Sequence, residues 1–472
     1  MAFVGLLFGL AAVLWSIPLL RHCSLPIAGF LVLVVGTIFG PSFFAIDSVV
    51  QVSLDRLLWA GMLAMFVIYW RLGRTGAKPL TRGDVALFLF VGLLAISSQR
   101  GAPPSGSSPL ARWLFYVFLP MGSYWVARSA RITRRDIEWI TQGLIVLALY
   151  LGITGILEVK GVHSLVFPKY IVDPGIVEFF GRARGPLLNP AGNGIVLGIG
   201  LAAATLRFLD AGRVGRLLYG AAVLVIMLGV YATLTRGVWI GAILVLGIIG
   251  VAYAPRWLRV WGLAFAVLLA GAVTMGLKDQ LLAMKRDKHL SAEDAAKSIS
   301  LRPLLAIVAY EMFKDAPLMG HGFGHYSQHS KYYYDNRSYD LPLDQARDYV
   351  QHNVLLSLLA DTGLLGVSCF VAALLFWTAR AWKLARDAMA SPGAKRLGLI
   401  VLCGVSTYFF NGMFQDVLVI PMVHMYLFYL GGLLVGVSLQ DGVLAEDTTS
   451  PWSSAPIADR RTGQRMATGL GG

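Results

Sequence analysis

The chain has 472 residues, of which 57% are hydrophobic and only 14% are charged, and its mean hydropathy is +0.67. This composition excludes a soluble protein, because so few charged residues cannot keep the surface of a chain of this size wet. The net charge of +14 does not indicate nucleic-acid binding, because the Lys and Arg residues gather in short loops between apolar runs.

Apolar runs of about 18–22 residues, the length of a membrane-spanning helix, recur along the chain. They predict an all-α polytopic membrane protein with about 12–13 transmembrane helices, in which residues 1–440 form a single transmembrane domain. The first run, from Ala2 to Leu20, lacks a basic start and a cleavage site, so we expect a retained span and no signal peptide. The candidate spans are centred near residues 11, 35, 62, 90, 118, 147, 199, 224, 244, 268, 371, 404 and 428.

Basic residues follow the odd-numbered candidate spans, and the positive-inside rule places them in the cytoplasm. The N-terminus is then outside and the C-terminus inside, with residues 441–472, rich in Ser, Thr, Gly and Pro, predicted as a disordered cytoplasmic tail. The loops that face away from the cytoplasm are those of about 158–187, the corner at Arg236 and a larger loop of about 278–350, for which we expect short helices. Basic residues in these outer loops are not explained by membrane insertion.

The first outer cluster is Gly181-Arg182-Ala183-Arg184-Gly185-Pro186, followed by Asn189 at the start of the next span. Arginine binds phosphate oxygens through two parallel hydrogen bonds, and a helix N-terminus adds partial positive charge. Arg182 and Arg184 are therefore candidates for binding a phosphate group. The alternative is contact with lipid headgroups.

The second candidate, Arg236, lies between two apolar runs, where a charged group is costly and often functional. A snorkelling arginine that fixes a helical hairpin is the alternative.

The third candidate, Arg302, precedes Pro303 and an apolar face formed by Leu304, Leu305, Val308 and Met312. Proline suits the first turn of a helix, so we expect a helix over 301–314 that lies on the membrane surface with Arg302 at its N-terminus. An ordinary amphipathic helix with a solvated arginine is the alternative.

The fourth cluster is the glycine-rich turn around His321 and His325, followed by His352 and Asn353. Three histidines suggest a metal, but no carboxylate or cysteine accompanies them at a ligand spacing, so we predict no metal. A histidine acts as a general base without companion ligands, and His352, at the boundary between loop and span, is the preferred candidate. Tyrosines nearby either stack on sugars or form an interfacial belt; they are Tyr332, Tyr333, Tyr334 and Tyr339.

Other sequence features are consistent with a chain that carries no cofactor. The three cysteines, Cys23, Cys369 and Cys403, lie in or beside apolar segments, where packing is the expected role. The sequence has no Walker-type phosphate loop, so an ATP-driven transporter would lack its motor in this chain.

The motifs of the outer loops resemble those of the bacterial O-antigen ligase superfamily, which includes O-antigen and exopolysaccharide polymerases. The signature of that superfamily is similar to the run that begins with His352-Asn353 and ends, after nine further residues, with Gly363-x-x-Gly366. Its loop entry is similar to Pro317-Leu318-Met319-Gly320-His321-Gly322. Arg236 with Ile240 resembles its Arg-x-x-x-Leu element. Arg184-Gly185-Pro186 with Asn189-Pro190 resembles its second basic loop.

The resemblance implies a metal-independent membrane glycosyltransferase on the periplasmic face of the bacterial inner membrane. It would transfer a glycan from a polyprenyl (undecaprenyl) diphosphate carrier to a sugar hydroxyl of a glycan or of lipid A-core, alongside other polysaccharide assembly proteins. His352 would take the proton from the acceptor, and the arginines Arg182, Arg184, Arg236 and Arg302 would bind the diphosphate, with Arg236 and Arg302 also catalytic. Asp361 and Glu311 are candidates for orienting His352.

Two alternatives stay open at the level of the sequence. Ligase and polymerase are not distinguished, although the lack of a feature dedicated to lipid A-core favours a polymerase. A transporter or flippase would show repeated halves and ionisable groups at the bilayer midplane. The sequence shows no such repeat.

Overall fold

The computed structural model describes most of the chain between residues 23 and 444. Leu25–Ala445 form one compact unit. The start of the predicted domain 1–440 and most of the predicted tail 441–472 lie outside the described residues, and both stay predictions. The described residues are 23–46, 52–76, 78–100, 108–253, 255, 257, 292–335, 338–347, 349–440, 442 and 444, with backbone alone for 292–300.

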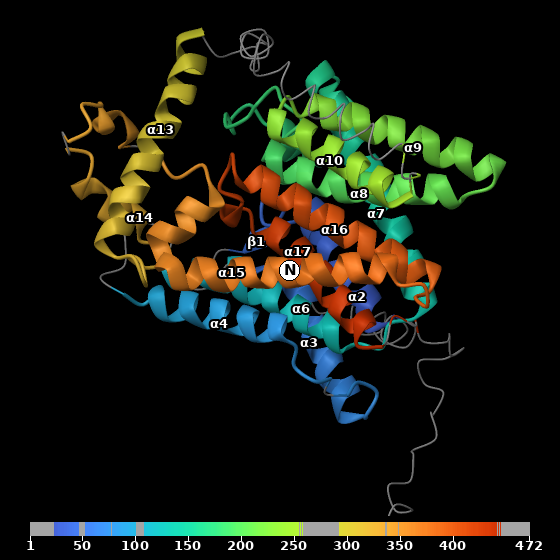
Figure 1. The fold of residues 1–472 in the computed structure, drawn as a ribbon. Helices are drawn as coiled ribbons and strands as arrows, with labels where there is room; N and C mark the ends of the chain where they lie inside the picture. The colour runs from blue at the N-terminus through green and yellow to red at the C-terminus, as the bar shows by residue number, and fades with distance from the viewer. Residues whose placement is uncertain are drawn as a thin grey trace, which may run out of the picture. The chain divides into compact units, whose positions relative to one another are not determined.

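The described part of the chain is helical apart from loops and one short antiparallel hairpin, in which Ala45 pairs with Ser53. Figure 1 shows the arrangement, in which α15 and α16 lie side by side. The elements are α2 (Leu25–Ile38), β1 (Ala45–Ile46), β2 (Val52–Ser53), α3 (Leu54–Arg71), α4 (Arg82–Ser97), α5 (Pro109–Trp113), the π-helix η1 (Leu114–Phe118), α6 (Leu119–Ser129), α7 (Arg134–Lys160), the 3-10 helices η2 (His163–Leu165) and η3 (Lys169–Val172), α8 (Pro190–Asp210), α9 (Arg213–Ala232), α10 (Arg236–Tyr253), α13 (Ala292–Asp315), α14 (Tyr326–His329), the 3-10 helices η5 (Ser330–Tyr332) and η6 (Leu343–Ala346), α15 (Val354–Arg386), α16 (Pro392–Gly412), the 3-10 helix η7 (Val417–Val419) and α17 (Pro421–Ser438).

Seven of the helices in the described residues are long and apolar enough to cross a membrane: α7, α8, α9, α10, α15, α16 and α17. Of the thirteen predicted span centres, those near residues 11 and 268 lie outside the described residues, and the other eleven fall within helices. α2 and α4 have 14 and 16 residues and are shorter than a full crossing. The prediction of an all-α polytopic membrane protein is confirmed.

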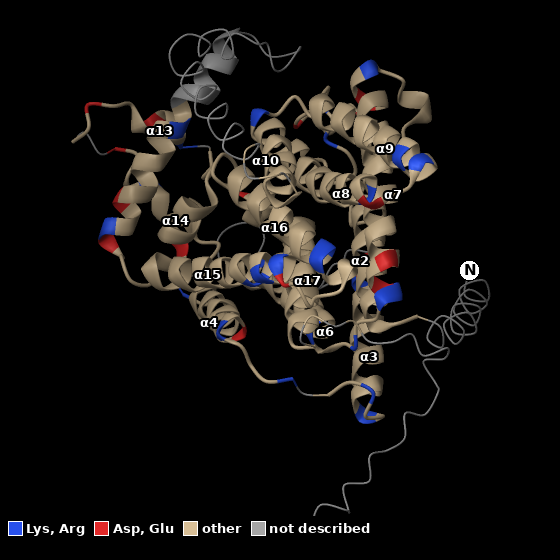
Figure 2. Cartoon of the chain, turned by 45° about the vertical axis from the view of Figure 1, so that its right-hand side comes forward, with Lys and Arg blue, Asp and Glu red and all other residues tan. Residues whose placement is uncertain are grey.

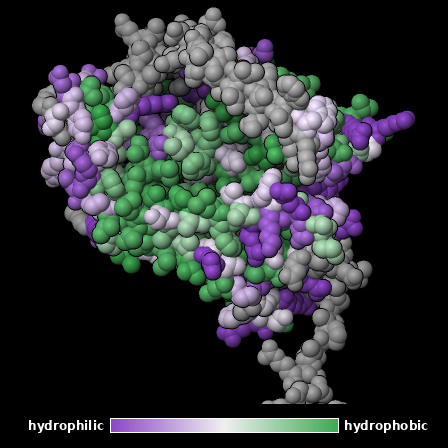
Figure 3. All heavy atoms as spheres, viewed as in Figure 1, coloured by the Kyte–Doolittle hydropathy of each residue, from purple (hydrophilic) through white to green (hydrophobic). Residues whose placement is uncertain are grey.

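The outer surface of the helices is apolar, as lipid contact requires. On α9, Leu217 and Leu218 are 77% and 68% exposed, and Figure 3 shows a broad hydrophobic surface with hydrophilic residues towards its margins. Charged residues lie mainly at helix ends and in loops (Figure 2). Few charges are left along the helix bodies, which agrees with their insertion into lipid.

Ion pairs hold the helices together at the end where α4 and α7 begin. Arg128 of α6 and Asp84 of α4 are both fully buried, with Nε and Oδ1 2.7 Å apart. Glu138 of α7 pairs with Arg207 of α8 and with Arg396 of α16. Some basic residues of the predicted cytoplasmic side therefore form ion pairs within the protein.

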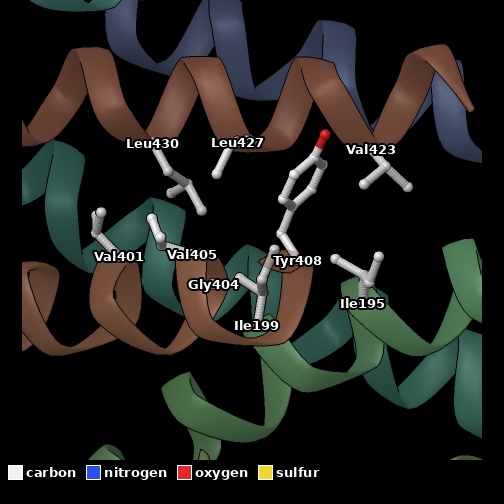
Figure 4. Close-up of a pocket in the computed structure, with 9 residues that line it drawn as sticks. All are labelled: Ile195, Ile199, Val401, Gly404, Val405, Tyr408, Val423, Leu427 and Leu430. Atoms are coloured by element: carbon white, nitrogen blue, oxygen red, sulfur yellow. The ribbon is translucent and has the colours of Figure 1, made fainter. Parts of the chain in front are cut away.

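The core between α8, α16 and α17 is closely packed. A void of about 10 Å³ lies there, lined by nine residues that are apolar apart from the Tyr408 hydroxyl (Figure 4). Such a space has room for about one water molecule. It is a packing defect, too small to serve as a path for a solute.

Candidate functional site

His352 lies immediately before α15, and its neighbour Asn353 caps that helix. The side-chain oxygen of Asn353 accepts hydrogen bonds from the backbone N–H groups of Leu355 (2.9 Å) and Leu356 (3.1 Å). Its Nδ2 donates to the carbonyl of Met413 at 3.0 Å, so the start of α15 is attached to the loop after α16. The cap fixes the backbone that carries His352, whose side chain is exposed.

Gln351 connects His352 to the helix that carries Arg302, a connection that the sequence does not reveal. Its buried Nε2 donates to the carbonyl of Leu305 at 2.5 Å and to the hydroxyl of Tyr326 at 3.0 Å. Arg302 lies three residues before Leu305 on α13 and is half-buried. A lone glutamine carries no motif, which explains why sequence reasoning missed it.

The prediction that Arg302 begins a helix is wrong, since α13 starts at Ala292 and Pro303 lies inside it. Proline removes one helical hydrogen bond but does not end this helix, because tertiary packing holds the following turns. The expected apolar face exists, with Val308 and Met312 fully buried. It packs against residues 326–346 and α15 in a second core, and not on a membrane surface as expected.

The tyrosines of the same loop mostly belong to this second core. Tyr334 is buried, the Tyr333 hydroxyl donates to Asp315 at 2.6 Å, and the Tyr339 hydroxyl donates to Glu311. Of the four tyrosines, Tyr332 is the one whose side chain is accessible to a ligand, because it is 82% exposed.

The glycine-rich loop and α15 interlock through their backbones. α15 is broken at Gly363, where φ is 61° and ψ is −160°. Beyond the break, the N–H groups of Leu364 and Leu365 donate to the carbonyls of Pro317 (2.8 Å) and Leu318 (3.1 Å). The break therefore frees backbone groups that the loop satisfies.

The loop returns two hydrogen bonds to the part of α15 that precedes the break. The N–H groups of His321 and Gly322 donate to the carbonyls of Ala360 (2.9 Å) and Asp361 (2.8 Å). A Cβ on Gly320, where φ is +60°, would lie 2.4 Å from backbone atoms of this segment. The two glycine motifs of the sequence are thus two halves of one structure, which we call the loop–helix interlock (317–322 with 360–365).

The histidines of the loop have partners within the protein. Nε2 of His321 lies 2.9 Å from the carbonyl of Met312. His325 is buried, with Nε2 3.3 Å from the carbonyl of Ser98 and Nδ1 3.0 Å from Gln328. These contacts favour a role in fixing the loop, and their predicted place as secondary site residues stays a prediction.

Arg184 is fully buried and makes five hydrogen bonds to backbone carbonyls of its own loop. Its Nε and Nη2 donate to Ile171, Nη2 also to Asp173, and Nη1 to Ile176 and Glu178. In this arrangement its donors hold residues 171–178 in place. Its predicted binding of a diphosphate stays a prediction that would need some of these bonds to break.

Arg182 and Arg236 lie on neighbouring segments. Arg182 is buried, and its Nη2 donates to the Thr235 hydroxyl at 2.6 Å. Arg236 is half-buried at the first position of α10. A Cβ on the next residue, Gly237, would lie 3.0 Å from Oδ1 of Asn411, near the end of α16.

Several of the candidate residues lie where helices begin, namely Asn189, Arg236, His352 and Asn353, whereas Arg302 lies inside α13. Asn189 caps α8 by accepting hydrogen bonds from Ala191 and Gly192, and α10 and α15 begin beside the end of α16. Helix N-termini carry partial positive charge and add to the charge of the arginines. The arrangement suits a ligand with concentrated negative charge.

Asp361 and Glu311, the predicted partners of His352, have partners elsewhere. Oδ2 of Asp361 accepts a hydrogen bond from the N–H of Gly324 at 3.1 Å. Glu311 pairs with Lys314 at 2.7 Å and accepts from Tyr339, and these bonds hold the pKa of Glu311 below its usual range. Their predicted orienting role stays a prediction.

Asp416, in the loop between α16 and α17, supports the start of α15. It is buried and accepts hydrogen bonds from the Ser357 hydroxyl (2.8 Å) and the N–H of Leu418 (3.0 Å). Burial raises the pKa of Asp416 to about 6, although these two hydrogen bonds act in the opposite direction. No motif in the sequence points to this residue.

The replacement Asp416→Asn should stabilise the protein at neutral pH. A carboxyl whose pKa is raised by folding binds its proton more tightly in the folded state, so stability falls as the pH rises from about 4 to 6. We expect the variant to melt about 2–4 °C higher at pH 7.5, with the gain shrinking toward pH 4. Thermal unfolding in detergent measures this, and Asp344→Asn, at an exposed acid, is the control. A gain that does not depend on pH would contradict the assignment.

The described residues form a polytopic helical membrane protein, and its candidate arginines and histidine lie in the loop before α8, at the starts of α10 and α15 and inside α13. Residues 221–371 match the family model described as O-Antigen ligase. The match spans Arg236, Arg302, His352 and Gly363, and it confirms the predicted resemblance: the chain carries a domain of the O-antigen ligase superfamily. The domain supports glycosyl transfer of the O-antigen ligase or polymerase type. No curated protein matches the chain.

Proposed function

We propose that this protein transfers a glycan from a polyprenyl diphosphate carrier to a sugar hydroxyl on the extracytoplasmic face of a bacterial inner membrane, in O-antigen or exopolysaccharide assembly. The observation that carries the proposal is the position of His352, exposed at the capped start of α15 and joined through Gln351 to the helix of Arg302. This group lies within the matched domain.

The proposed reaction needs a base and positive charge. His352 takes the proton of the acceptor hydroxyl as its oxygen bonds to the anomeric carbon of the donor sugar. The bond from that carbon to the diphosphate oxygen breaks, and polyprenyl diphosphate leaves with the electron pair. Arg236 and Arg302 stabilise the negative charge that develops on the leaving group. The carbon–oxygen bond formed replaces the one broken, so no nucleotide is required as an energy source, and in this proposal the arginines supply the positive charge at the leaving group.

The remaining arginines and amides take supporting places in the proposal. Arg184 holds the loop 171–178, and Arg182 joins that loop to the corner before Arg236. Asn353 and Asn189 cap the helices whose N-termini face the ligand. We expect their replacement to affect the shape of the site more than the proton transfer.

Replacement of Arg302 by alanine should weaken donor binding and turnover together. We expect kcat/KM to fall about 10²–10³-fold, because a charge that stabilises the leaving group is lost. Arg302→Lys should not restore the rate if the contact is bidentate, since an ammonium presents a point charge. Steady-state kinetics with a lipid-linked donor measure both variants, with Lys331→Ala, at an exposed residue of the same loop, as the control. Full activity of Arg302→Ala would contradict the assignment.

Purified protein incubated in EDTA with a radiolabelled polyprenyl-diphosphate oligosaccharide tests the function itself. Product that forms only with lipid A-core identifies a ligase, and laddered product without it identifies a polymerase. Transfer in neither case, with movement of the carrier across a vesicle bilayer, would overturn the enzyme in favour of the alternative, a transporter or flippase.

A further inference from the structure

A cavity of about 370 Å³ lies beside the candidate site, and most of its lining residues have no role in the proposed reaction. Its walls come from α2, the start of α3, the π-helix η1, the loop before α8 and the start of α17. This volume is within the range of pockets that bind small ligands, about 300–1,000 Å³. Its chemical character rests on Asp55, Arg56, Phe115, Glu178 and Met422.

The polar wall of the cavity is built by local structure. A π-helical turn interrupts the helical segment 109–129 at Leu114–Phe118, and such turns occur frequently at functional sites. It carries Phe115, and the guanidinium of Arg56 lies over its ring, 3.5 Å from the centroid. Asp55 accepts a hydrogen bond from the Ser53 hydroxyl at 2.5 Å. The cation and the neighbouring carboxylate are therefore held in defined places.

Another part of the cavity wall, at Glu178, is held by Arg184. Nη1 of Arg184 donates to the carbonyl of Glu178 at 2.7 Å, which fixes the backbone that places Glu178 in the cavity wall. Tyr170 donates to the carbonyl of Pro186 at 3.0 Å and closes the same loop upon itself. The five bonds of Arg184 thus support a wall as well as a loop.

The charges of the cavity select among ligand classes. Two carboxylates and one guanidinium give a net charge of −1, which repels a diphosphate. Three ionisable side chains in the walls also disfavour an isoprenoid chain, whose burial against charged groups is costly. A sugar satisfies both kinds of wall, because its hydroxyls bond to carboxylates and guanidinium while its C–H face packs on apolar groups such as Met422 and Met425.

The cavity shares its walls with the candidate site. Asn189, which caps α8, lines it, as does Ile420, at the end of the loop that binds Asn353 through Met413. We propose that this cavity binds uncharged sugar residues of the glycan substrate beside the place of transfer. The inference rests on the proposed function and assigns the substrate class of one subsite.

Binding of a glycan without its lipid separates this proposal from the transfer reaction. The probe is the repeat-unit oligosaccharide released by mild acid from the lipid-linked precursor of the producing cell, titrated calorimetrically into full-length protein in nanodiscs. We expect Glu178→Gln and Asp55→Asn each to weaken binding about tenfold or more, through loss of a charged hydrogen bond. Asp173→Asn, an exposed acid of the same loop, is the matched control and should bind as the wild type does.

Binding by the wild type and by His352→Ala, with loss in Glu178→Gln, supports the subsite even if no transfer is found. Steady-state kinetics of the cavity variants show whether the sugar belongs to the donor or to the acceptor. A KM raised about tenfold for one of the two substrates, with kcat unchanged, identifies the substrate whose glycan enters the cavity. Transfer by the wild type with equal binding and equal KM in both cavity variants would overturn the subsite and leave the proposed function standing. No binding of the probe to the wild type would also overturn it.

Discussion

His352→Ala should lower the rate of glycan transfer by about 10²–10⁴-fold while the protein stays folded. The proposed proton acceptor is removed, but the backbone around it is held by the Asn353 cap and by Gln351, neither of which uses the imidazole. Single-turnover kinetics with lipid-linked donor measure the loss directly.

The matched control for this variant is His163→Ala, at an exposed histidine of the loop after α7. It should transfer at the wild-type rate, and both variants should melt at the wild-type temperature. Full activity in His352→Ala would show that another group takes the proton.

Gly363→Ala should disrupt the loop–helix interlock and with it the activity. A Cβ at this position would lie 2.5 Å from the carbonyl carbon of Leu318, a backbone atom that cannot move aside alone. The φ and ψ of Gly363 are also essentially restricted to glycine, so strain of about 1–3 kcal/mol is added. We expect the rate of transfer to fall about tenfold or more. Release of the loop from α15 disturbs the packing of α13 against α15, and this packing positions Arg302 and His352.

Hydrogen exchange gives this prediction a readout apart from activity. The amides of Leu364 and Leu365 donate to the loop in the wild type and should lose protection in Gly363→Ala. Gly92→Ala is the control, because a Cβ there meets no atom within 4 Å and alanine favours the helix. Unchanged protection together with unchanged transfer would show that the interlock tolerates a side chain.

The helices were predictable from the sequence because their apolar runs are long, and so was the position of His352 at the boundary between a loop and a span. The start of α13 was not, because Pro303 is a strong local signal for a first turn, whereas the packing of Val308 and Met312 decides the structure. Local preference is weaker than burial of this kind.

The direction of the arginine side chains could not be predicted from the sequence either. An arginine between glycines is consistent both with binding a phosphate and with binding its own backbone, and only the fold shows that the donors of Arg184 turn inward. The cavity at Arg56 and Phe115 joins segments more than 50 residues apart through a π-helical turn that has no sequence signal. Apart from Asn189, its residues were absent from the predicted site for that reason.

The break in α15 separates two helical pieces of unequal length. Residues 354–362 rise about 14 Å and residues 364–386 about 35 Å, whereas a helix needs about 30 Å to cross the hydrocarbon layer. Only the piece after Gly363 is therefore long enough to cross a membrane by itself. In the proposed function, His352 then stands before a short helix whose direction is set by Gly363 and by the loop bound to it, and not by the longer piece.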